Sequence, residues 1–278
     1  MPNKPALPVA QYAVFGNPIS HSKSPVLHSA FAAQTHQSLS YSAILAPLDQ
    51  FEATLKRFIA DGGSGANITV PFKLDAFQLC TKLTPRAQAA GAVNTLSFAN
   101  GEISGDNTDG CGLIKDIVEN AGITLFNKRI LLLGAGGAAR GAILPLLECQ
   151  PTELVVANRS QEKAQQLAQE FQQYGTINAG EFAQLHDSFD VIINATSASI
   201  SAERPAIPDT VYKPGALAYD LMYAAQPTLF MQHAAQHSAN ARDGWGMLIE
   251  QAAEAFYIWR GVRPDTTRLL NKENFPAS

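Results

Sequence analysis

The sequence has no excess of basic residues and no long apolar run. Its 278 residues carry 20 Lys and Arg against 24 Asp and Glu, a formal net charge of −4. A basic surface for nucleic acid is therefore not expected. No stretch approaches the roughly 20 apolar residues that a helix needs to span a bilayer, and residues 1–11 lack the apolar core of a signal peptide. We expect neither nucleic acid nor a membrane among the partners.

Cysteine is also scarce. Cys80, Cys111 and Cys149 share no metal-ligand spacing, so the sequence predicts no metal site. An odd, scattered set of cysteines is typical of reduced thiols, which favours a cytoplasmic protein. Internal repeats and low-complexity segments are missing too. What the chain does have is length and apolar content, because 278 residues with 46% apolar side chains are enough for two domains with full cores.

A glycine-rich loop lies near the middle of the chain. Residues 134–140 read GAGGAAR and follow the apolar run at residues 129–133. A buried strand, then Gly-x-Gly-x-x-Ala, then a helix is the order that builds a dinucleotide site. Gly134 permits the tight turn, Gly136 lets a pyrophosphate approach the backbone, and the helix N-terminus offers N–H groups with partial positive charge. The loop therefore predicts dinucleotide binding, and the alternative is a turn without a ligand.

The end of the next strand, at residues 153–157, indicates which dinucleotide binds. NAD sites place an Asp or Glu there to bond the ribose 2′-hydroxyl. This chain has Asn158, Arg159 and Ser160 instead, with Lys163 one turn further on. The planar guanidinium of an arginine can pair with a 2′-phosphate, and a lysine adds a second charge. The segment favours NADP over NAD, and the alternative is a solvated helix start.

Two polar segments in the first hundred residues could bind a substrate. Ser22 and Ser24 follow a predicted strand, and their hydroxyls could bond a polyol or a carboxylate. The alternative is that Ser24 only caps a helix that begins with Pro25. Lys73 falls just inside a helix that follows the predicted strand at residues 66–70. A lysine at a helix N-terminus opposes the helix dipole, which makes it a candidate catalytic residue, and the alternative is a surface lysine.

The run Asp106-Asn107-Thr108-Asp109-Gly110 packs two carboxylates, an amide and a hydroxyl into five residues. A turn followed by a helix cap would explain it without any chemistry. A carboxylate that faces a lysine, however, is a usable pair for proton transfer. A nearby carboxylate of this run would also orient the ammonium group of such a lysine, and both explanations stay open.

Alternating strand and helix patterns predict an α/β protein of two domains with a cleft between them. The first is an α/β substrate domain at residues 1–109, and the second is a doubly wound, Rossmann-type domain at residues 110–244. A final helix at residues 247–260 is apolar on several sides, so we expect residues 245–278 to rejoin the first domain. Asn100-Gly101 predicts a type I′ hairpin. Three residues of the C-terminal part have no evident role and are interpreted as ordinary surface: His233, His237 and Arg242.

Together these segments resemble the shikimate dehydrogenases, in family order and over nearly the whole chain. The matching stretches are residues 16–25, 65–73, 90–95, 105–110, 134–140, 158–160, 194–197 and 243–248. The resemblance implies the reversible reduction of 3-dehydroshikimate to shikimate with NADPH, a step toward chorismate and the aromatic amino acids. It leaves the oligomeric state open between a monomer and a homodimer.

The resemblance also implies roles for individual residues. Lys73 and Asp109 match the catalytic pair of the family, and Ser22 and Ser24 match the residues that hold the substrate carboxylate. The other residues expected to line the substrate site are Thr69, Asn94, Tyr223 and Gln251. The residues expected to bind NADP are Gly134, Ala135, Gly136, Gly137, Ala138, Asn158, Arg159, Ser160, Lys163, Leu221 and Gly244.

The chain departs from the family pattern at three places. Ala198-Ser199 stands where a glycine is common, Leu221 where methionine is frequent, and Lys163 where arginine is frequent. Two other functions stay open. One is a quinate or dual quinate/shikimate dehydrogenase, which tends to use NAD, and the other is a non-catalytic NADP-binding regulator on the same fold.

Overall fold

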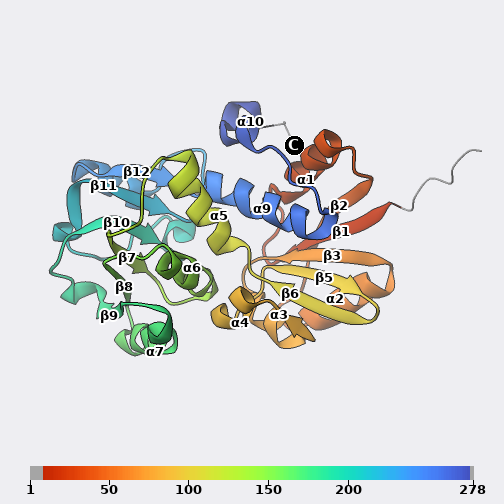
Figure 1. The fold of residues 1–278 in the computed structure, drawn as a ribbon, viewed down its shortest axis with the longest axis horizontal. Helices are drawn as coiled ribbons and strands as arrows, with labels where there is room; N and C mark the ends of the chain where they lie inside the picture. Colours follow the sequence, from red (N-terminus) through yellow and green to blue (C-terminus); the bar gives the residue numbers. More distant parts are fainter. Residues whose placement is uncertain (1–8, 276–278) are drawn as a thin grey trace, which may run out of the picture. The chain divides into compact units, whose positions relative to one another are not determined.

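The computed structural model describes residues 9–275. Residues 1–8 and 276–278 lie outside the described residues. They include most of residues 1–11, for which the sequence predicts no signal peptide. The chain is an α/β protein, as predicted, and its strands form two six-stranded sheets (Figure 1). It divides into two compact units, Met1–Thr108 with Gln251–Ser278 (unit 1) and Asp109–Glu250 (unit 2). Among residues 9–275, every helix is too short or too polar to cross a membrane.

The sheet of unit 1 is mixed, with strand order β2-β1-β3-β5-β6-β4. Strand β1 pairs in parallel with β2 and β3, whereas β5 is antiparallel to both β3 and β6. Asn100 and Gly101 join β5 to β6 with φ angles of 52° and 77°, which confirms the predicted type I′ turn. The strands are β1 Ala10–Gly16, β2 Leu39–Leu45, β3 Gly63–Ile68, β4 Lys82–Leu83, β5 Thr95–Ala99 and β6 Glu102–Asp106.

Short helices accompany this sheet, and the start of the first one differs from the expectation. Ser24 is the first helical residue rather than the cap, because Lys23 occupies the N-cap position and makes no side-chain capping bond. The interpretation of Ser24 as a helix cap is therefore wrong. The helices are α1 Ser24–Thr35, α2 Phe51–Ala60, α3 Lys73–Leu79, α4 Pro85–Ala90, α10 Thr267–Leu270 and the 3₁₀ turn η6 Lys272–Asn274.

The C-terminal half of α9 (Trp245–Arg260) packs against the sheet of unit 1. The Trp259 ring stacks on Tyr12 at 4.5 Å, and its Nε1 donates to the carbonyl of Leu96 at 3.0 Å. A Cβ on Gly65 would lie 2.7 Å from that nitrogen, so only glycine permits this approach. These contacts explain why the helix is apolar on several sides.

The sheet of unit 2 is entirely parallel, with strand order β12-β11-β10-β7-β8-β9. This is the doubly wound arrangement, in which the chain order reverses between β7 and β10. Its central strand β7 is apolar and buried from Ile130 to Leu133, as parallel sheets covered on both faces require. The strands are β7 Arg129–Leu133, β8 Glu153–Asn158, β9 Ile177–Glu181, β10 Phe189–Asn194, β11 Tyr212–Asp220 and β12 Asn240–Asp243.

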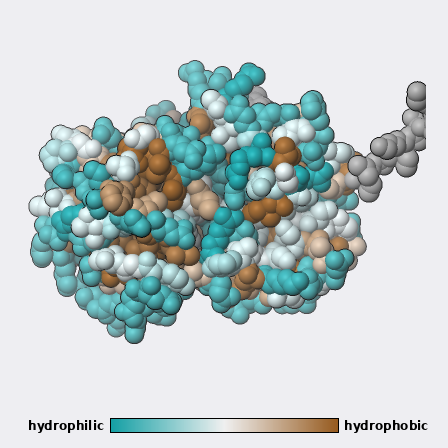
Figure 2. Space-filling model, viewed as in Figure 1, coloured by the Kyte–Doolittle hydropathy of each residue, from teal (hydrophilic) through white to brown (hydrophobic). Residues whose placement is uncertain are grey.

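Helices connect these parallel strands. Most of the face seen in Figure 2 is hydrophilic, with separate hydrophobic patches between the polar residues. The longer helices of unit 2, besides the start of α9, are α5 Asp109–Lys115, α6 Gly137–Glu148, α7 Gln161–Phe171 and α8 Leu229–Gln236. The short turns are the π-helical η1 Asp116–Asn120 and the 3₁₀ turns η2 Gln172–Tyr174, η3 Phe182–Gln184, η4 Ala198–Ser201 and η5 Asp209–Val211.

A buried carboxylate joins η1 to β11 and β12 in unit 2. Asp116 is fully buried and accepts two hydrogen bonds from the guanidinium of Arg242, at 2.6 and 2.7 Å. The hydroxyl of Tyr219 donates to the same carboxylate at 2.7 Å. Burial and the neighbouring Asp116 charge raise the pKa of Tyr219 well above its usual value. The interpretation of Arg242 as ordinary surface is therefore wrong, since this residue neutralises a buried charge.

We expect Asp116→Ala to lower the free energy of unfolding by about 3 kcal/mol, the lower end for a broken buried ion pair, because Arg242 keeps part of its surface in water. Chemical denaturation of the purified protein measures this change. Glu119→Ala is the control, since it removes an exposed carboxylate from the same turn and should change stability by less than about 0.5 kcal/mol. Equal effects of the two variants would contradict the assignment.

Candidate functional site

The candidate substrate residues of unit 1 gather at one edge of its sheet. Ser22 and Ser24 follow the end of β1, and Thr69 and Lys73 follow the end of β3. Because these neighbouring strands are parallel, both segments leave the sheet at the same edge. Asn94 directly precedes β5, which is antiparallel to β3, so it reaches the same edge from the opposite direction. We call this the carboxyl edge of unit 1.

Close backbone packing fixes the loop that carries Thr69 and Lys73. The Thr69 N–H donates to the carbonyl of Phe15 at 2.9 Å, and a Cβ on Gly16 would lie only 2.5 Å from the Thr69 methyl group. Lys73 is the first residue of α3, as predicted, and its carbonyl accepts a hydrogen bond from the Val93 N–H at 2.9 Å. Its side chain is half-buried.

Asn94 is the centre of a buried hydrogen-bond network at this edge. Its amide donates to the Thr108 hydroxyl at 2.9 Å and to the side-chain oxygen of Gln251 at 3.2 Å. Its carbonyl oxygen accepts from the Thr108 N–H and from the Thr95 hydroxyl, both at 2.8 Å. Asn94 is 2% exposed, so these bonds replace the water that an amide would otherwise need. The network brings together the predicted residues Asn94 and Gln251.

The network continues to Asn67, in the matching stretch at residues 65–73, and to Tyr41 and His28, which the sequence did not indicate. Asn67 donates to the Thr95 hydroxyl at 3.1 Å and accepts from the Tyr41 hydroxyl at 2.7 Å. Burial raises the pKa of Tyr41 well above its usual value, and a hydrogen bond with Ser24 opposes this shift. His28 stacks on Tyr41 at 4.2 Å, and burial lowers the pKa of His28 to about 3, so the imidazole is neutral near pH 7. Tyr41 thus ties Ser24 into the same network.

The two carboxylates of the run at residues 106–110 have different surroundings. Asp106 accepts a bidentate pair of bonds from Arg86, at 2.6 and 2.8 Å, and a third from the Thr84 hydroxyl at 2.7 Å. Its charge is therefore neutralised within unit 1. Asp109 is the first residue of α5 and is 5% exposed. It belongs to unit 2 and Lys73 to unit 1, so their pairing stays a prediction.

In unit 2, two glycines of the loop after β7 serve different purposes. Gly134 has a φ of 111°, and a Cβ there would lie 3.0 Å from the carbonyl oxygen of Ala195, at the point where the strand order reverses. Gly136 is exposed, and a Cβ built on it meets no atom of the described chain within 4 Å. The first glycine therefore permits the turn, and the second leaves open space beside the backbone.

That open space adjoins the N-terminus of α6. Three neighbouring residues are half-buried: Ala135, Gly137 and Ala138. The first turn of α6 contains no acidic residue. Arg140, the last residue of the glycine-rich segment, forms an ion pair with Glu170 of α7. No acidic side chain of that first turn therefore competes for the first N–H groups of the helix, which suits a phosphate.

Strand β8 ends at Asn158 rather than at an acidic residue. The Asn158 amide donates to the carbonyl of Ser160 at 3.2 Å and so fixes the turn into α7. Ser160 is half-buried, whereas Arg159 and Lys163 are exposed. The two cations can therefore reach a ligand at this end of the strand.

A buried carboxylate organises the loops after β10 and β11. Asp220 accepts from the hydroxyls of Ser199 and Thr228 at 2.6 and 2.7 Å, and from the amide of Asn194 at 3.2 Å. The Met222 N–H donates to it as well, at 3.1 Å. Ser199, one of the departures from the family pattern, is therefore a structural hydrogen-bond donor, and it holds η4 against β11.

The structure also brings together Leu221, Gly244 and Tyr223 beside this carboxylate. A Cβ on Gly244 would lie 2.2 Å from the carbonyl oxygen of Leu221, and the Gly244 N–H donates to the Met222 carbonyl at 3.0 Å. The Tyr223 ring packs edge-on against Trp245 at 5.9 Å. Glycine is thus required at position 244 by the close approach of two backbones.

Three protein families match successive parts of the chain. The shikimate dehydrogenase substrate binding domain matches residues 14–96, and the shikimate / quinate 5-dehydrogenase family matches residues 115–207. The shikimate 5′-dehydrogenase C-terminal domain matches residues 244–270. The chain belongs to the shikimate dehydrogenase family.

Individual family members are similar over nearly their whole length. The NADP(+) shikimate dehydrogenase of Herminiimonas arsenicoxydans is 59% identical over 260 residues, which cover 94% of this chain and 95% of that protein. The crystal structure of an Ael1 enzyme from Pseudomonas putida is 48% identical, with a TM-score of 0.89 over 97% of this chain and all of that one. Shikimate 5-dehydrogenase from Thermus thermophilus, in complex with NADP(H) and shikimate, is 30% identical, with a TM-score of 0.85 over 96% and 98% of the two chains.

Gly134 and Gly136 of the glycine-rich loop offer a matched pair of variants. Gly136→Ala should weaken NADP binding at least tenfold, because a methyl group would fill the open space beside the backbone, and should change the free energy of unfolding by less than about 1 kcal/mol. Gly134→Ala should lower the free energy of unfolding by about 1–3 kcal/mol, because the backbone φ at position 134 is unfavourable for alanine. Calorimetric titration with NADP and chemical denaturation measure the two quantities. Unchanged NADP binding by Gly136→Ala would contradict a phosphate site at this position.

Proposed function

We propose that this protein is an NADP-dependent shikimate dehydrogenase that reversibly reduces 3-dehydroshikimate to shikimate. The observation that carries the proposal is the carboxyl edge of unit 1, where Ser22, Ser24, Thr69, Lys73 and Asn94 gather, in a chain whose unit 2 is a dinucleotide fold. Relatives up to 59% identical are NADP(+) shikimate dehydrogenases, which supports the same activity.

The proposed substrate contacts follow from chemistry and from family membership. Ser22 and Ser24 bind the substrate carboxylate through their hydroxyls. Four further residues line the substrate site: Thr69, Asn94, Tyr223 and Gln251. The buried network around Asn94 and Gln251 supports this assignment, because it fixes the rotamers of side chains that must meet a polyol in one orientation.

The proposed catalytic residues are Lys73 and Asp109. NADPH, when bound, supplies the hydride that adds to the C3 carbonyl carbon of 3-dehydroshikimate. The Lys73 ammonium donates a proton to the oxygen that becomes the hydroxyl of shikimate, and in the reverse direction the neutral amine takes that proton back. Asp109 accepts a hydrogen bond from the neighbouring substrate hydroxyl and orients the lysine.

The proposed NADP site is formed by residues 134–138, which hold the pyrophosphate at the N-terminus of α6. Arg159 and Lys163 bind the 2′-phosphate, and Asn158 and Ser160 shape the turn between them. Leu221 and Gly244 lie toward the nicotinamide. The open space at Gly136 and the exposed cations after β8 support this assignment.

Arg159 should decide the preference between the two dinucleotides. We expect Arg159→Ala to raise the KM for NADPH about tenfold to a hundredfold, equivalent to the loss of one charge-assisted hydrogen-bond pair. The KM for NADH should stay nearly constant, since NADH has no 2′-phosphate. Lys163→Ala, which removes a point charge rather than a planar fork, should have a smaller effect. Parallel losses with NADPH and NADH would contradict this role.

One assay tests the activity itself and separates it from the two alternatives. Shikimate and NADP are mixed with the purified protein, and NADPH formation is followed by its absorbance. The same measurement with quinate and with NAD tests a quinate or dual-specificity dehydrogenase. An absence of signal with every pair at high protein concentration would favour a non-catalytic NADP-binding regulator and contradict the proposal.

The same assay tests the catalytic lysine. Lys73→Ala should lower kcat about 10²–10⁴-fold, the usual contribution of a positioned acid, and should change KM far less. Lys56→Ala is the control, because Lys56 is an exposed lysine of the same unit that pairs with Glu52, and its kinetics should match the unchanged protein. A change in KM alone would show that Lys73 binds substrate without transferring the proton.

The cellular compartment and the oligomeric state complete the proposal. The scattered cysteines support a cytoplasmic protein with reduced thiols. We expect a monomer or a homodimer, which the molar mass in solution distinguishes.

A further inference from the structure

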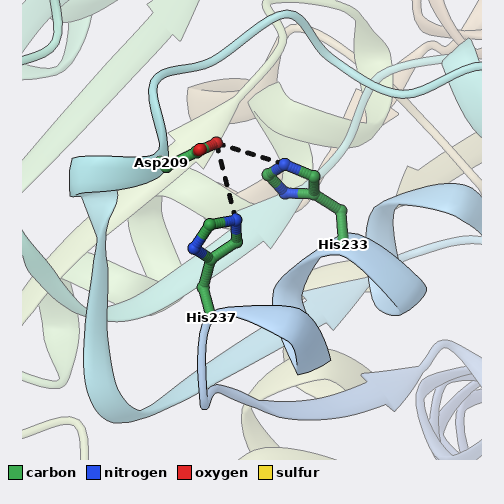
Figure 3. Close-up of side chains that lie close together, drawn as sticks. All are labelled: Asp209, His233 and His237. Carbon is green, nitrogen blue, oxygen red and sulfur yellow. Dashed lines mark ion pairs between the residues drawn. The ribbon is translucent and has the colours of Figure 1, made fainter.

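Two histidines and an aspartate converge in unit 2, at the opposite end of its sheet from the glycine-rich loop. His233 lies in α8, His237 caps the same helix one turn later, and Asp209 begins the turn η5 (Figure 3). The Nε2 atoms of His233 and His237 lie 3.1 and 3.6 Å from the same carboxylate oxygen of Asp209. The sequence suggested only surface histidines, because Asp209 is more than twenty residues away along the chain.

We propose that Asp209, His233 and His237 form a Zn²⁺ site, with water as the fourth ligand. Two neutral imidazoles and one carboxylate carry a single negative charge and are ligands that zinc prefers. With bonds of about 2.0–2.2 Å, the ligand atoms of a tetrahedral zinc site lie about 3.3–3.6 Å apart. The two separations from the Asp209 oxygen are therefore close to what the ion needs, and the three ligand atoms all lie within 4.8 Å of one another.

The surroundings hold the two imidazoles in place. The His237 ring stacks on Tyr212 at 5.6 Å with an interplanar angle of 9°, and the His233 ring also lies 5.6 Å from Tyr212. Tyr212 begins β11 directly after η5, so a residue close to Asp209 in the chain packs against both histidines. The Thr228 hydroxyl caps α8 and fixes where the helix starts. A side chain that is already oriented loses less entropy when it binds an ion.

The site lies at the amino ends of the strands, since η5 precedes β11 and the two histidines are at the C-terminal end of α8. All strands of this sheet are parallel, so the glycine-rich loop is at the opposite, carboxyl edge. The ion would cross-link α8 to η5 without contacting the dinucleotide. Its expected effect is therefore on stability, and the inference does not depend on the proposed enzyme activity.

One nearby charge opposes the ion. The cationic side chain of Arg204 acts electrostatically on both His233 and Tyr212. Because Arg204 is exposed, the surrounding water screens much of this repulsion. Its removal should strengthen zinc binding, a change that a nonspecific site elsewhere on the chain would not show.

The test uses the full chain without a histidine tag, first freed of metal with a chelator. Zinc content after equilibrium dialysis should reach one ion per chain, and Co²⁺ should give the visible absorption of a four-coordinate site. Asp209→Asn, His233→Gln and His237→Phe should each weaken binding by at least about tenfold. His237→Phe keeps an aromatic ring on Tyr212, so its loss reports the ligand atom rather than the packing. Arg204→Ala should bind zinc more tightly.

Two controls exclude other ligands. His186→Gln removes an exposed histidine of the same unit, and a triple Cys→Ser variant at positions 80, 111 and 149 removes the thiols. Both should bind zinc like the unchanged chain. Zinc should also raise the thermal midpoint of that chain but not of His237→Phe. No zinc uptake, or uptake lost with the cysteines and kept without the three proposed ligands, would overturn the inference.

Discussion

Hydrogen bonds to one buried polar side chain hold the loops at the carboxyl edge of each sheet. In unit 1, Asn94 bonds Thr95, Thr108 and Gln251, which belong to three separate segments. In unit 2, Asp220 accepts bonds from Ser199, Thr228 and Asn194. A buried polar group without a partner costs about 1–3 kcal/mol, so each of these side chains restricts the backbone around it. Of the proposed site residues, Asn94 and Gln251 belong to the first of these networks, and Leu221 and Tyr223 flank Met222, whose N–H belongs to the second.

Close approach of backbones is the second constraint on these loops. Gly244 is required because a Cβ there would lie 2.2 Å from the carbonyl oxygen of Leu221, and Gly134 because its φ is 111° and the Ala195 carbonyl lies close to it. Gly246 is required for another reason, since a Cβ there would lie 1.8 Å from a carboxylate oxygen of Asp116. Gly136 meets no such obstacle, and its lack of a side chain leaves room for a ligand. Glycines in one unit thus serve packing at some positions and proposed binding at another.

Local patterns were sufficient to predict much of the fold. The apolar run at residues 129–133, the glycine-rich loop after it and the Asn100-Gly101 turn each depend on neighbours in the sequence, and the structure confirms all three. Lys73 at the start of a helix was predictable for the same reason. The helix cap assigned to Ser24 was wrong, because the preceding Lys23 takes the N-cap position and Ser24 makes its polar contact with Tyr41 instead.

The sequence by itself determined the α/β class, the dinucleotide loop and the family, since these follow from residue types at fixed spacing. Only the tertiary structure decided which charged residues are already paired. Asp106 is bound by Arg86, twenty residues away, and Asp116 by Arg242, 126 residues away. Asp209 meets His233 and His237 only because η5 and α8 pack on the same strand. Such partners are set by the path of the chain through the sheet, which no local pattern contains.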